Sequence, residues 1–224
     1  MSVAAIIPAR NEADRISSTV EALRDIAEIA ECIVVDDGSS DATGVRAAAA
    51  GARLIRSDRR RGKGGALAAG VARTDADVLL FIDADLEQAA ARAVVLLEPV
   101  LDGRLDMAIA APPPGAPSGF GLVEGLARVS IRAMTGRRMA RPLSGQRALH
   151  RRVLEAAHWP IAGFGVETGL TIDALRAGLR VDEVPMPVEH RLTGRTPAGF
   201  AHRARQGFDV LRVSLSRGVR FGSR

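Results

Sequence analysis

Residues 78–85 have the sequence VLLFIDAD, which joins an apolar run to two aspartates. The run from Val78 to Ile82 is β-prone and is typical of a buried strand in an α/β sheet. Asp83 and Asp85 follow its carboxyl end, where open α/β sheets bind ligands. Two carboxylates about 4 Å apart repel each other by roughly 4 kcal/mol at an effective dielectric near 20, unless a cation lies between them. Oxygen ligands with no neighbouring His or Cys favour Mg²⁺ or Mn²⁺, so the stretch predicts a metal site, with a solvated acidic turn as the alternative.

Apolar runs alternate with helical patterns through the first half of the chain. Strands are expected at 3–7, 32–35, 54–55, 78–82 and 107–110, and helices at 16–26, 43–50, 62–72 and 88–97. This order predicts an α/β fold with a mainly parallel sheet and helices on both faces. After a proline-rich break at 111–117, helices are expected at 122–135, 151–157 and 166–177, and extended chain at 180–184 and 188–190. We therefore predict one domain over residues 1–224, with a regular half at 1–110 and a less regular half at 111–224.

Composition limits the class of protein. The chain has 224 residues, 47% of them hydrophobic, which is enough for one sizeable domain. It carries 31 Lys and Arg against 26 Asp and Glu, for a net charge of +5, and Lys63 is its only lysine. Nearly all the cationic side chains are therefore arginines. Arginine is well suited to phosphate contacts, but we prefer to explain this excess by the replacement of Lys by Arg in high-GC genomes. Nucleic-acid binding is not expected, because aromatic residues make up only 3% of the chain and are not interleaved with the arginines.

No apolar run approaches the roughly 20 residues of a transmembrane helix, and no signal peptide is recognised, so a cytoplasmic protein is expected. The single Cys32 is expected to be a buried structural thiol. The last helical pattern has an apolar stripe and a basic face. This pattern predicts that the protein makes peripheral contact with the anionic inner face of the membrane. The equal alternative is a helix packed on its own domain. The stripe consists of Phe200, Ala204, Phe208, Leu211 and Leu215, and the basic face of Arg203, Arg205, Arg212, Arg217 and Arg220.

Polar clusters follow three of the predicted strands, at 8–12, 36–39 and 83–85. The carboxyl ends of parallel strands share one edge of a sheet, so these clusters are expected to converge there. Asp37 is predicted to bind a ligand, with a helix N-cap as its alternative. Gly62-Lys63-Gly64-Gly65 stands at a helix start that attracts anions, but it lacks the spacing of a P-loop. Lys63 is predicted to pair with Asp83 or with a phosphate.

In this order and spacing the motifs resemble those of the family 2 glycosyltransferases of GT-A fold. The resemblance is strongest over residues 3–90, and three later segments look like the second half of polyprenyl-phosphate sugar synthases. It implies a nucleotide-sugar-binding half at 1–110 and an acceptor-side half at 111–224. The later segments are 144–147, 163–167 and 184–195.

The resemblance also implies a binding site for a nucleotide-diphosphate sugar and a divalent metal. Asp37 would recognise the base, Asp83 would face the ribose or Lys63, and Asp85 would hold Mg²⁺ or Mn²⁺ against the pyrophosphate. In related polyprenyl-phosphate enzymes a glutamine at the position of Glu87 can complete the metal site. Arg10 stands at a position that is often occupied by an aromatic residue in this family. The residues implied in donor binding are Pro8, Ala9, Arg10, Glu12, Asp37, Lys63, Asp83, Ala84, Arg191 and Arg195.

Departure of a nucleoside diphosphate places negative charge on its β-phosphate, which the metal and nearby cations would stabilise. His190 is either a further metal or pyrophosphate contact or a structural histidine. A hydroxyl acceptor needs a general base, for which Glu167 is the candidate; binding acceptor hydroxyls or capping a helix are its alternatives. A phosphate acceptor needs no base, and Arg147, Arg191 and Arg195 would then position it.

The leading hypothesis is metal-dependent transfer of a hexose from a UDP- or GDP-sugar to a polyprenyl phosphate. A soluble acceptor such as a phosphorylated small acid is the alternative within the same fold. From other classes, a sugar-phosphate nucleotidyltransferase is weighed, but residues 8–12 lack the glycine-rich loop expected after its first strand. A degenerate nucleic-acid-binding module is the third hypothesis.

Overall fold

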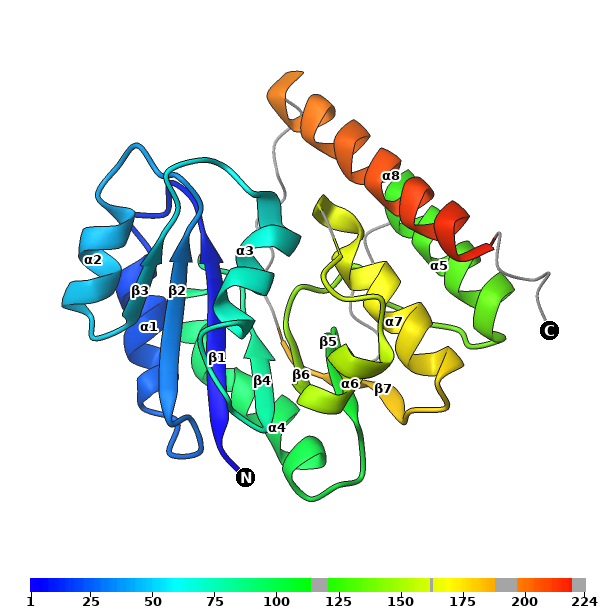
Figure 1. Cartoon of the computed structure of the whole chain (residues 1–224), viewed down its shortest axis with the longest axis horizontal. Coiled ribbons are helices and arrows are strands. Elements are labelled where there is room, and N and C mark those ends of the chain that lie inside the picture. Colours follow the sequence, from blue (N-terminus) through cyan, green and yellow to red (C-terminus); the bar gives the residue numbers. More distant parts are fainter. Residues whose placement is uncertain (114–120, 162, 188–196, 219–224) are drawn as a thin grey trace.

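A computed structural model describes residues 1–113, 121–161, 163–187 and 197–218, with side chains omitted for residues 164 and 197–206 (Figure 1). A seven-stranded sheet of order β3-β2-β1-β4-β6-β5-β7 forms its centre. The strands are β1 (Val3–Ala9), β2 (Glu31–Asp36), β3 (Arg53–Arg56), β4 (Val78–Phe81), β5 (Met107–Ala111), β6 (Arg147–His150) and β7 (Val181–Pro185).

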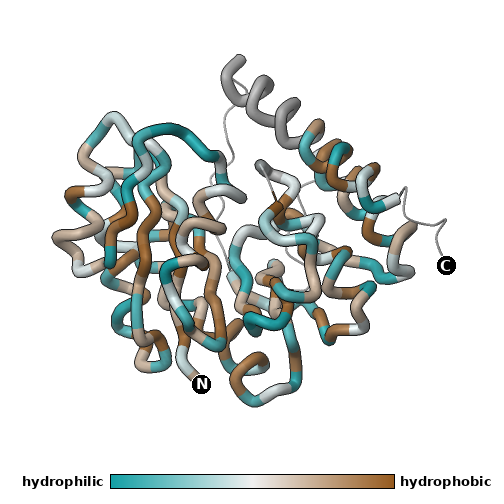
Figure 2. The backbone as a smooth tube through the Cα atoms, in the orientation of Figure 1, coloured by the Kyte–Doolittle hydropathy of each residue, from teal (hydrophilic) through white to brown (hydrophobic). Residues whose placement is uncertain are grey.

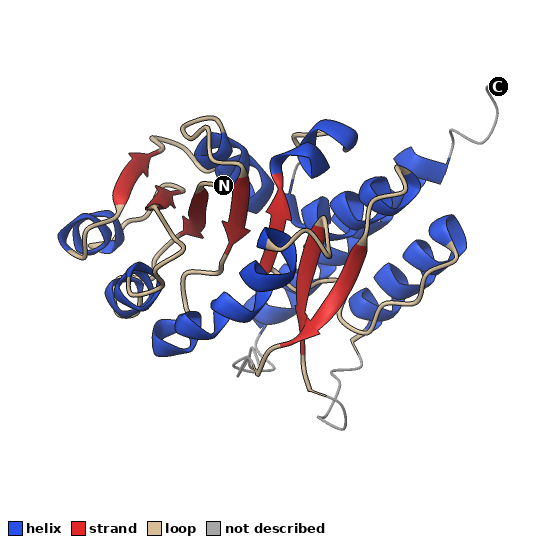
Figure 3. Ribbon diagram, turned by 90° about the horizontal axis from the view of Figure 1, so that it is seen from below, coloured by secondary structure: helices blue, strands red, loops and turns tan. Residues whose placement is uncertain are grey.

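Helices cover both faces of this sheet, as the view from below shows (Figure 3). The α-helices are α1 (Ile16–Arg24), α2 (Thr43–Ala49), α3 (Gly62–Val71), α4 (Val94–Leu101), α5 (Leu122–Thr135), α6 (Arg151–Ala156), α7 (Val166–Arg176) and α8 (Pro197–Gly218). Two 3₁₀ helices complete the described chain, η1 (Glu87–Ala93) and η2 (Gly163–Gly165).

Side chains along β1 alternate between the two faces of the sheet, and each face has its own hydrophobic core. Val3, Ala5 and Ile7 pack with α1, α2, η1 and α4 on one face, and Ala4 and Ile6 pack with α3, α6 and α7 on the other. Successive residues of a strand point to opposite faces, so a strand that is apolar throughout can bury both. The apolar strands lie inside, between helices of mixed polarity (Figure 2). The predicted α/β class is confirmed.

Two elements differ from the sequence prediction. Strand β6 was not foreseen; it pairs antiparallel with both β4 and β5, although the sheet is otherwise parallel. Its four residues include Arg147 and His150, so it lacks the apolar run by which the other strands were recognised. The helix expected at 88–97 is instead the 3₁₀ helix η1 followed by α4, which ends at Leu101.

The buried face of the C-terminal helix α8 differs from the apolar stripe predicted from the sequence. Val210, Val213 and Arg217 are buried against the domain, whereas the apolar residues Phe208 and Leu211 are 65% and 43% exposed. Arg217 therefore does not belong to a solvated basic face, because its guanidinium makes two hydrogen bonds to the buried carboxylate of Asp173. Within the described residues, no helix is both long enough and apolar enough to span a membrane.

Gly64 fixes how closely α3 approaches the loop before η2. A Cβ built on Gly64 would lie 1.9 Å from the backbone oxygen of Ile161. We expect Gly64→Ala to lower the free energy of unfolding by about 1–3 kcal/mol, because backbone cannot move aside as a flexible side chain can. Gly125→Ala is the control: a Cβ there meets nothing within 4 Å, and removing a helical glycine stabilises by about 0.5–1 kcal/mol. Urea unfolding of both variants measures the difference, and equal stabilities would contradict this packing.

Candidate active site

The three polar clusters meet at one edge of the sheet, as predicted. Strand β1 lies between β2 and β4 and is parallel to both, with Ala9 opposite Asp36 and Ile6 opposite Phe81. Asn11 links the first two clusters: its N–H donates to Ser39 Oγ at 3.0 Å, and its Oδ1 accepts from the backbone N–H of Ser40 at 2.9 Å. Its φ of 55° lies in the left-handed region, which asparagine tolerates better than most residues.

The predicted donor residues of the first loop lie at this edge with different exposures. Pro8 is half-buried, Ala9 is buried and Arg10 is exposed. Ala9 also accepts a hydrogen bond from the backbone N–H of Asp37 at 2.9 Å, which ties this loop to the end of β2. Arg10 is therefore the member of this group that projects into solvent.

Asp37 holds the start of α3. Its Oδ1 accepts from the backbone N–H of Arg61 at 2.6 Å, and its Oδ2 accepts from that of Gly62 at 2.8 Å. Asp37 is only 5% exposed. The alternative weighed from the sequence was a cap for the helix that follows Asp37, but the carboxylate serves the next helix along the chain. It thereby fixes the entry to the helix that carries Lys63.

Lys63 lies between two carboxylates from opposite halves of the chain. Its Nζ is 2.6 Å from Asp83 Oδ1 and 2.9 Å from Glu167 Oε1. Gln146 donates from Nε2 to Asp83 Oδ2 at 2.7 Å, so Asp83 is held from two sides. A Cβ on Gly145 would lie within 2.5 Å of both Lys63 Nζ and Asp83 Oδ2, which explains the glycine at this position. The predicted pairing of Lys63 with Asp83 is confirmed.

The charge of Lys63 depends on these partners. Burial by itself lowers the pKa of the Lys63 ammonium, but the negative charges of Asp83 and Glu167 outweigh it and hold this pKa above its ordinary value of 10.5. Lys63 is therefore a permanent cation at neutral pH. Asp83 has a lysine as its counterion, so the repulsion between Asp83 and Asp85 expected from the sequence is relieved without a shared metal.

Arg147 was predicted to touch an acceptor, and the structure corrects this. Its side chain is 1% exposed. Its guanidinium donates to the backbone oxygens of Ser144 and Glu167 and to Thr171 Oγ1, at 2.6–3.3 Å. Burial lowers the pKa of Arg147 to about 10. Arg147 therefore braces the start of α7, which carries Glu167, and does not reach the solvent side of the site.

Asp85 is the exposed carboxylate of the pair. Burial and the neighbouring charge of Asp85 together raise the pKa of Glu12 above its ordinary value, which places the two carboxylates in each other's field. Arg15 offsets part of this negative charge, 3.0 Å from Glu12 and 3.7 Å from Glu87. Glu87, with φ 52°, is thus held by an arginine, and Asp85 is the oxygen donor that best fits a divalent metal.

The remaining predicted residues, His190, Arg191 and Arg195, lie outside the described part of the chain. Within that part, no three His, Cys, Asp or Glu side chains form a cluster that could enclose a metal.

Two residues of the site were missed from the sequence. Gln146 belongs to segment 144–147, from which only Arg147 was predicted to have a role in the site. The structure shows that Gln146 is the residue that contacts Asp83. Arg15 precedes a predicted helix and lies three residues after Glu12, a spacing that places two side chains side by side on a helical turn. That spacing was the available signal for Arg15. Nothing local marks Gln146, because it reaches Asp83 through the pairing of β6 with β4.

A mainly parallel sheet with acidic clusters at its carboxyl edge, one of them an Asp-x-Asp sequence whose first aspartate pairs with a lysine, is typical of a nucleotide-sugar transferase of GT-A fold. The family model "Glycosyl transferase family 2" matches residues 4–144. The chain therefore belongs to glycosyl transferase family 2 and is a glycosyltransferase, as the motifs indicated.

Several relatives extend this comparison. Glucosyl-3-phosphoglycerate synthase of Mycolicibacterium paratuberculosis is 32% identical over 96% of this chain and 72% of its own length. Undecaprenyl-phosphate mannosyltransferase of Micrococcus luteus is 29% identical over 88% of this chain and 87% of its own. The crystal structure of the Mycobacterium tuberculosis glucosyl-3-phosphoglycerate synthase with Mn²⁺, uridine diphosphate and glucosyl-3-phosphoglycerate matches with a TM-score of 0.82. It is 30% identical, over 96% of this chain and 79% of that one. The predicted divalent metal agrees with the Mn²⁺ of this neighbour.

Proposed function

We propose that the protein transfers glucose from UDP-glucose to a hydroxyl of a small phosphorylated acid such as 3-phosphoglycerate, with Mn²⁺ or Mg²⁺ bound at Asp85. The relatives that support this acceptor are the glucosyl-3-phosphoglycerate synthases. The proposal replaces polyprenyl phosphate, our leading acceptor from the sequence, with the alternative weighed beside it. The observation that carries it is the exposed Asp85 beside the Lys63–Asp83 pair at the carboxyl edge of the sheet.

The metal would neutralise the charge that develops on the departing diphosphate. Asp85 would hold it there, while Asp83, fixed by Lys63 and Gln146, would accept hydrogen bonds from donor hydroxyls on the same edge. Asp37 would bind the base from its place beside the start of α3. Glu167 would act as general base through Oε2, since its Oε1 lies 2.9 Å from Lys63 Nζ and the residue is only 5% exposed. In this proposal the described residues would bind the donor and the metal and provide a proton acceptor.

A second candidate is transfer to a polyprenyl phosphate at a membrane surface. It is favoured by large apolar side chains that α5 and α8 expose to solvent, and by the mannosyltransferase relative. Figure 1 shows the two helices side by side on the far side of the molecule from α1 and α2. An apolar helix surface beside arginines is suited to peripheral contact with anionic lipid. These side chains are Leu122, Val129, Phe208, Leu211 and Leu215.

Release of UDP from UDP-glucose, measured with each acceptor in turn, separates the two candidates. We expect Mn²⁺-dependent release with 3-phosphoglycerate, abolished by EDTA and restored by Mn²⁺. Undecaprenyl phosphate in vesicles of phosphatidylglycerol is the second arm, with sedimentation of the protein on the same vesicles. Transfer to the lipid alone would overturn the proposed acceptor. If the protein binds UDP and Mn²⁺ but transfers glucose to neither acceptor, then either UDP-glucose is not its donor or neither compound is its acceptor.

A further inference from the structure

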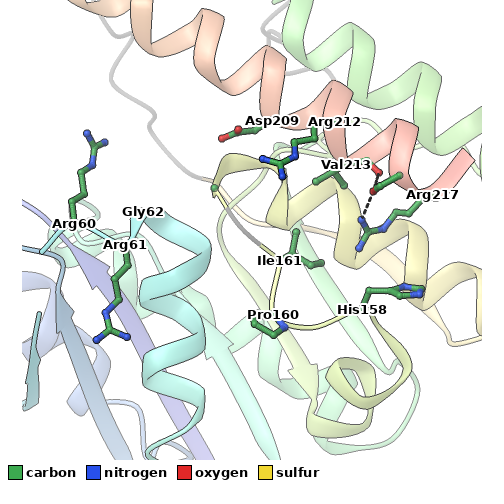
Figure 4. Close-up of a pocket in the computed structure, with 12 residues that line it drawn as sticks. Arg60, Arg61, Gly62, His158, Pro160, Ile161, Asp209, Arg212, Val213 and Arg217 are labelled. Atoms are coloured by element: carbon green, nitrogen blue, oxygen red, sulfur yellow. Dashed lines mark hydrogen bonds between the residues drawn. The ribbon is translucent and has the colours of Figure 1, made fainter. Parts of the chain in front are cut away.

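The Lys63 side of the active site is held by α3, the loop before η2 and helix α8. These elements line a pocket of about 520 Å³, with Gly62 and Ile161 on its walls and Arg212 extending into it from α8 (Figure 4). Residues 84–87, which include Asp85, are not among the described lining residues of this pocket. They are held instead by α1, which packs on the other face of the sheet from α3.

A single hydroxyl of α1 joins two main-chain groups that flank Asp85. Thr19 Oγ1 donates to the backbone oxygen of Ala84 at 2.9 Å and accepts from the backbone N–H of Glu87 at 2.8 Å. Thr19 Oγ1 also lies 3.3 Å from the oxygen of Arg15, the helical acceptor four residues earlier. A threonine hydroxyl has one proton to donate, and the bond to Ala84 is the shorter of the two. We call the two bonds to Ala84 and Glu87 the Thr19 bridge.

The chain inside the Thr19 bridge is fixed on both sides of Asp85. Ala84 and Leu86 are 4% and 8% exposed and belong to the hydrophobic core that α1 covers, whereas Asp85 between them is exposed. Glu87 has a φ of 52°, in the left-handed region that is costly for residues other than glycine. Its N–H is the group that Thr19 binds, so the bridge stabilises this conformation. The backbone is therefore held while the Asp85 carboxylate faces solvent.

The position of Asp85 matters because of the kind of metal that it would hold. Mg²⁺ and Mn²⁺ are bound by few protein carboxylates together with substrate phosphates, and Mg²⁺ demands near-ideal geometry. A small displacement of a single carboxylate therefore removes much of what the protein contributes to the site. Residues that fix a metal ligand from behind typically change metal affinity by about 10- to 100-fold when they are replaced. Thr19 lies in that place relative to Asp85, since it contacts the backbone one residue before and two residues after it.

We propose that Thr19 is a positioning residue for Asp85 and that its hydroxyl sets the affinity of the active site for the divalent metal. This inference rests on the proposed function, in which Asp85 holds the metal. Thr19 is fully buried and acts through the loop, without contact to metal or substrate. Because Thr19 is uncharged, replacing it changes the support of Asp85 and leaves the charge of the site as it was. A change at Arg15, by contrast, would alter both, since Arg15 pairs with Glu12 and Glu87.

Titration with Mn²⁺ in the presence of UDP tests the bridge without any acceptor, with free Mn²⁺ measured by electron paramagnetic resonance. Thr19→Val keeps the shape of the side chain but removes its hydroxyl, and we expect Mn²⁺ binding to weaken by about tenfold. Thr19→Ala, which lacks the hydroxyl and adds no bulk, should lose affinity as well. Thr19→Ser keeps the hydroxyl and should restore most of the affinity.

Thr135→Val is the matched control for loss of a threonine hydroxyl. Thr135 Oγ1 likewise donates to a main-chain oxygen, that of Ile131 at 2.7 Å, and accepts from a backbone N–H, that of Arg137 at 3.2 Å. It lies at the end of α5, away from the metal edge. We expect Thr135→Val to bind Mn²⁺ as the wild type does. Affinity for UDP without metal should be unchanged in every variant.

The outcomes separate the Thr19 bridge from the proposed function. Wild-type Mn²⁺ affinity in Thr19→Val and Thr19→Ala, an equal loss in Thr135→Val, or no recovery in Thr19→Ser overturns the bridge even where glucose is transferred. Weakened binding that Thr19→Ser restores, in a protein that transfers glucose to neither acceptor, supports the bridge and overturns the proposed function. Wild-type Mn²⁺ affinity in Asp85→Asn overturns the metal site on which both depend. Where transfer occurs, Thr19→Val should need about tenfold more Mn²⁺ for half-maximal rate, with kcat recovered at saturating Mn²⁺.

Discussion

Replacing Asp85 with asparagine is expected to lower kcat by about 10²- to 10³-fold, as loss of a group that stabilises transition-state charge does in other enzymes. The amide keeps the shape of the carboxylate but removes the charge that would hold the metal against the donor diphosphate. Asp85 is exposed, so the fold should persist. Its charge raises the pKa of Glu12, so the variant should bring that pKa closer to the ordinary value. Steady-state UDP release across a range of Mn²⁺ concentrations measures the effect.

Two variants show whether the loss is specific to Asp85. Asp75→Asn changes an exposed aspartate just before β4, at the opposite edge of the sheet, and should leave kcat unchanged. Glu87→Gln tests the predicted second metal ligand. Because Glu87 pairs with Arg15 at 3.7 Å, we expect a loss of no more than about fivefold, the effect of a partly exposed ion pair. Full activity of Asp85→Asn at saturating Mn²⁺ would contradict the metal role.

The sequence predicted the edge of the sheet on which the site lies, but not the partners of its charged residues. Apolar runs such as 78–82 identify strands because burial on both faces demands apolar residues at every position. The polar turns that follow them then converge by topology alone. The partners of Asp37 and Asp83 depend instead on helix α3 and strand β6, which are distant in sequence. A pattern read along the chain does not encode such contacts.

Helix α8 shows a second kind of limit. Its apolar stripe is visible in the sequence, yet the packed face includes Arg217, because Asp173 of α7 supplies a buried counterion. Charge alone would place Arg217 in solvent. Arg147 was misjudged for the same reason, since main-chain oxygens and Thr171 satisfy a guanidinium that is almost fully buried. Buried arginines are recognised only once their acceptors are known.

Replacing Lys63 with methionine is expected to lower the free energy of unfolding by up to about 3 kcal/mol, the lower end of the cost of removing one partner from a buried ion pair, because the Lys63 and Asp83 side chains are 19% and 29% exposed. The change leaves Asp83 and Glu167 facing each other without the cation that lies 2.6 and 2.9 Å from them. Transfer should be lost as well, because Asp83 is no longer fixed at the donor edge. Arg104→Gln, which breaks an exposed pair with Asp102, is the control and should cost less than about 1 kcal/mol.

The pH dependence of stability separates this mechanism from simple loss of packing. In the native protein the pKa of Lys63 is raised, so its stabilisation is complete below its ordinary pKa of 10.5 and declines as the pH rises further. In Lys63→Met the two unpaired carboxyls should bind protons more readily when folded than when unfolded, so the deficit should shrink as the pH falls from 7 to 5. Adding Glu167→Gln removes one of the two charges and should recover part of the stability. Urea unfolding at several pH values measures all of these, and a deficit independent of pH would show that lost packing, rather than unpaired charge, destabilises the variant.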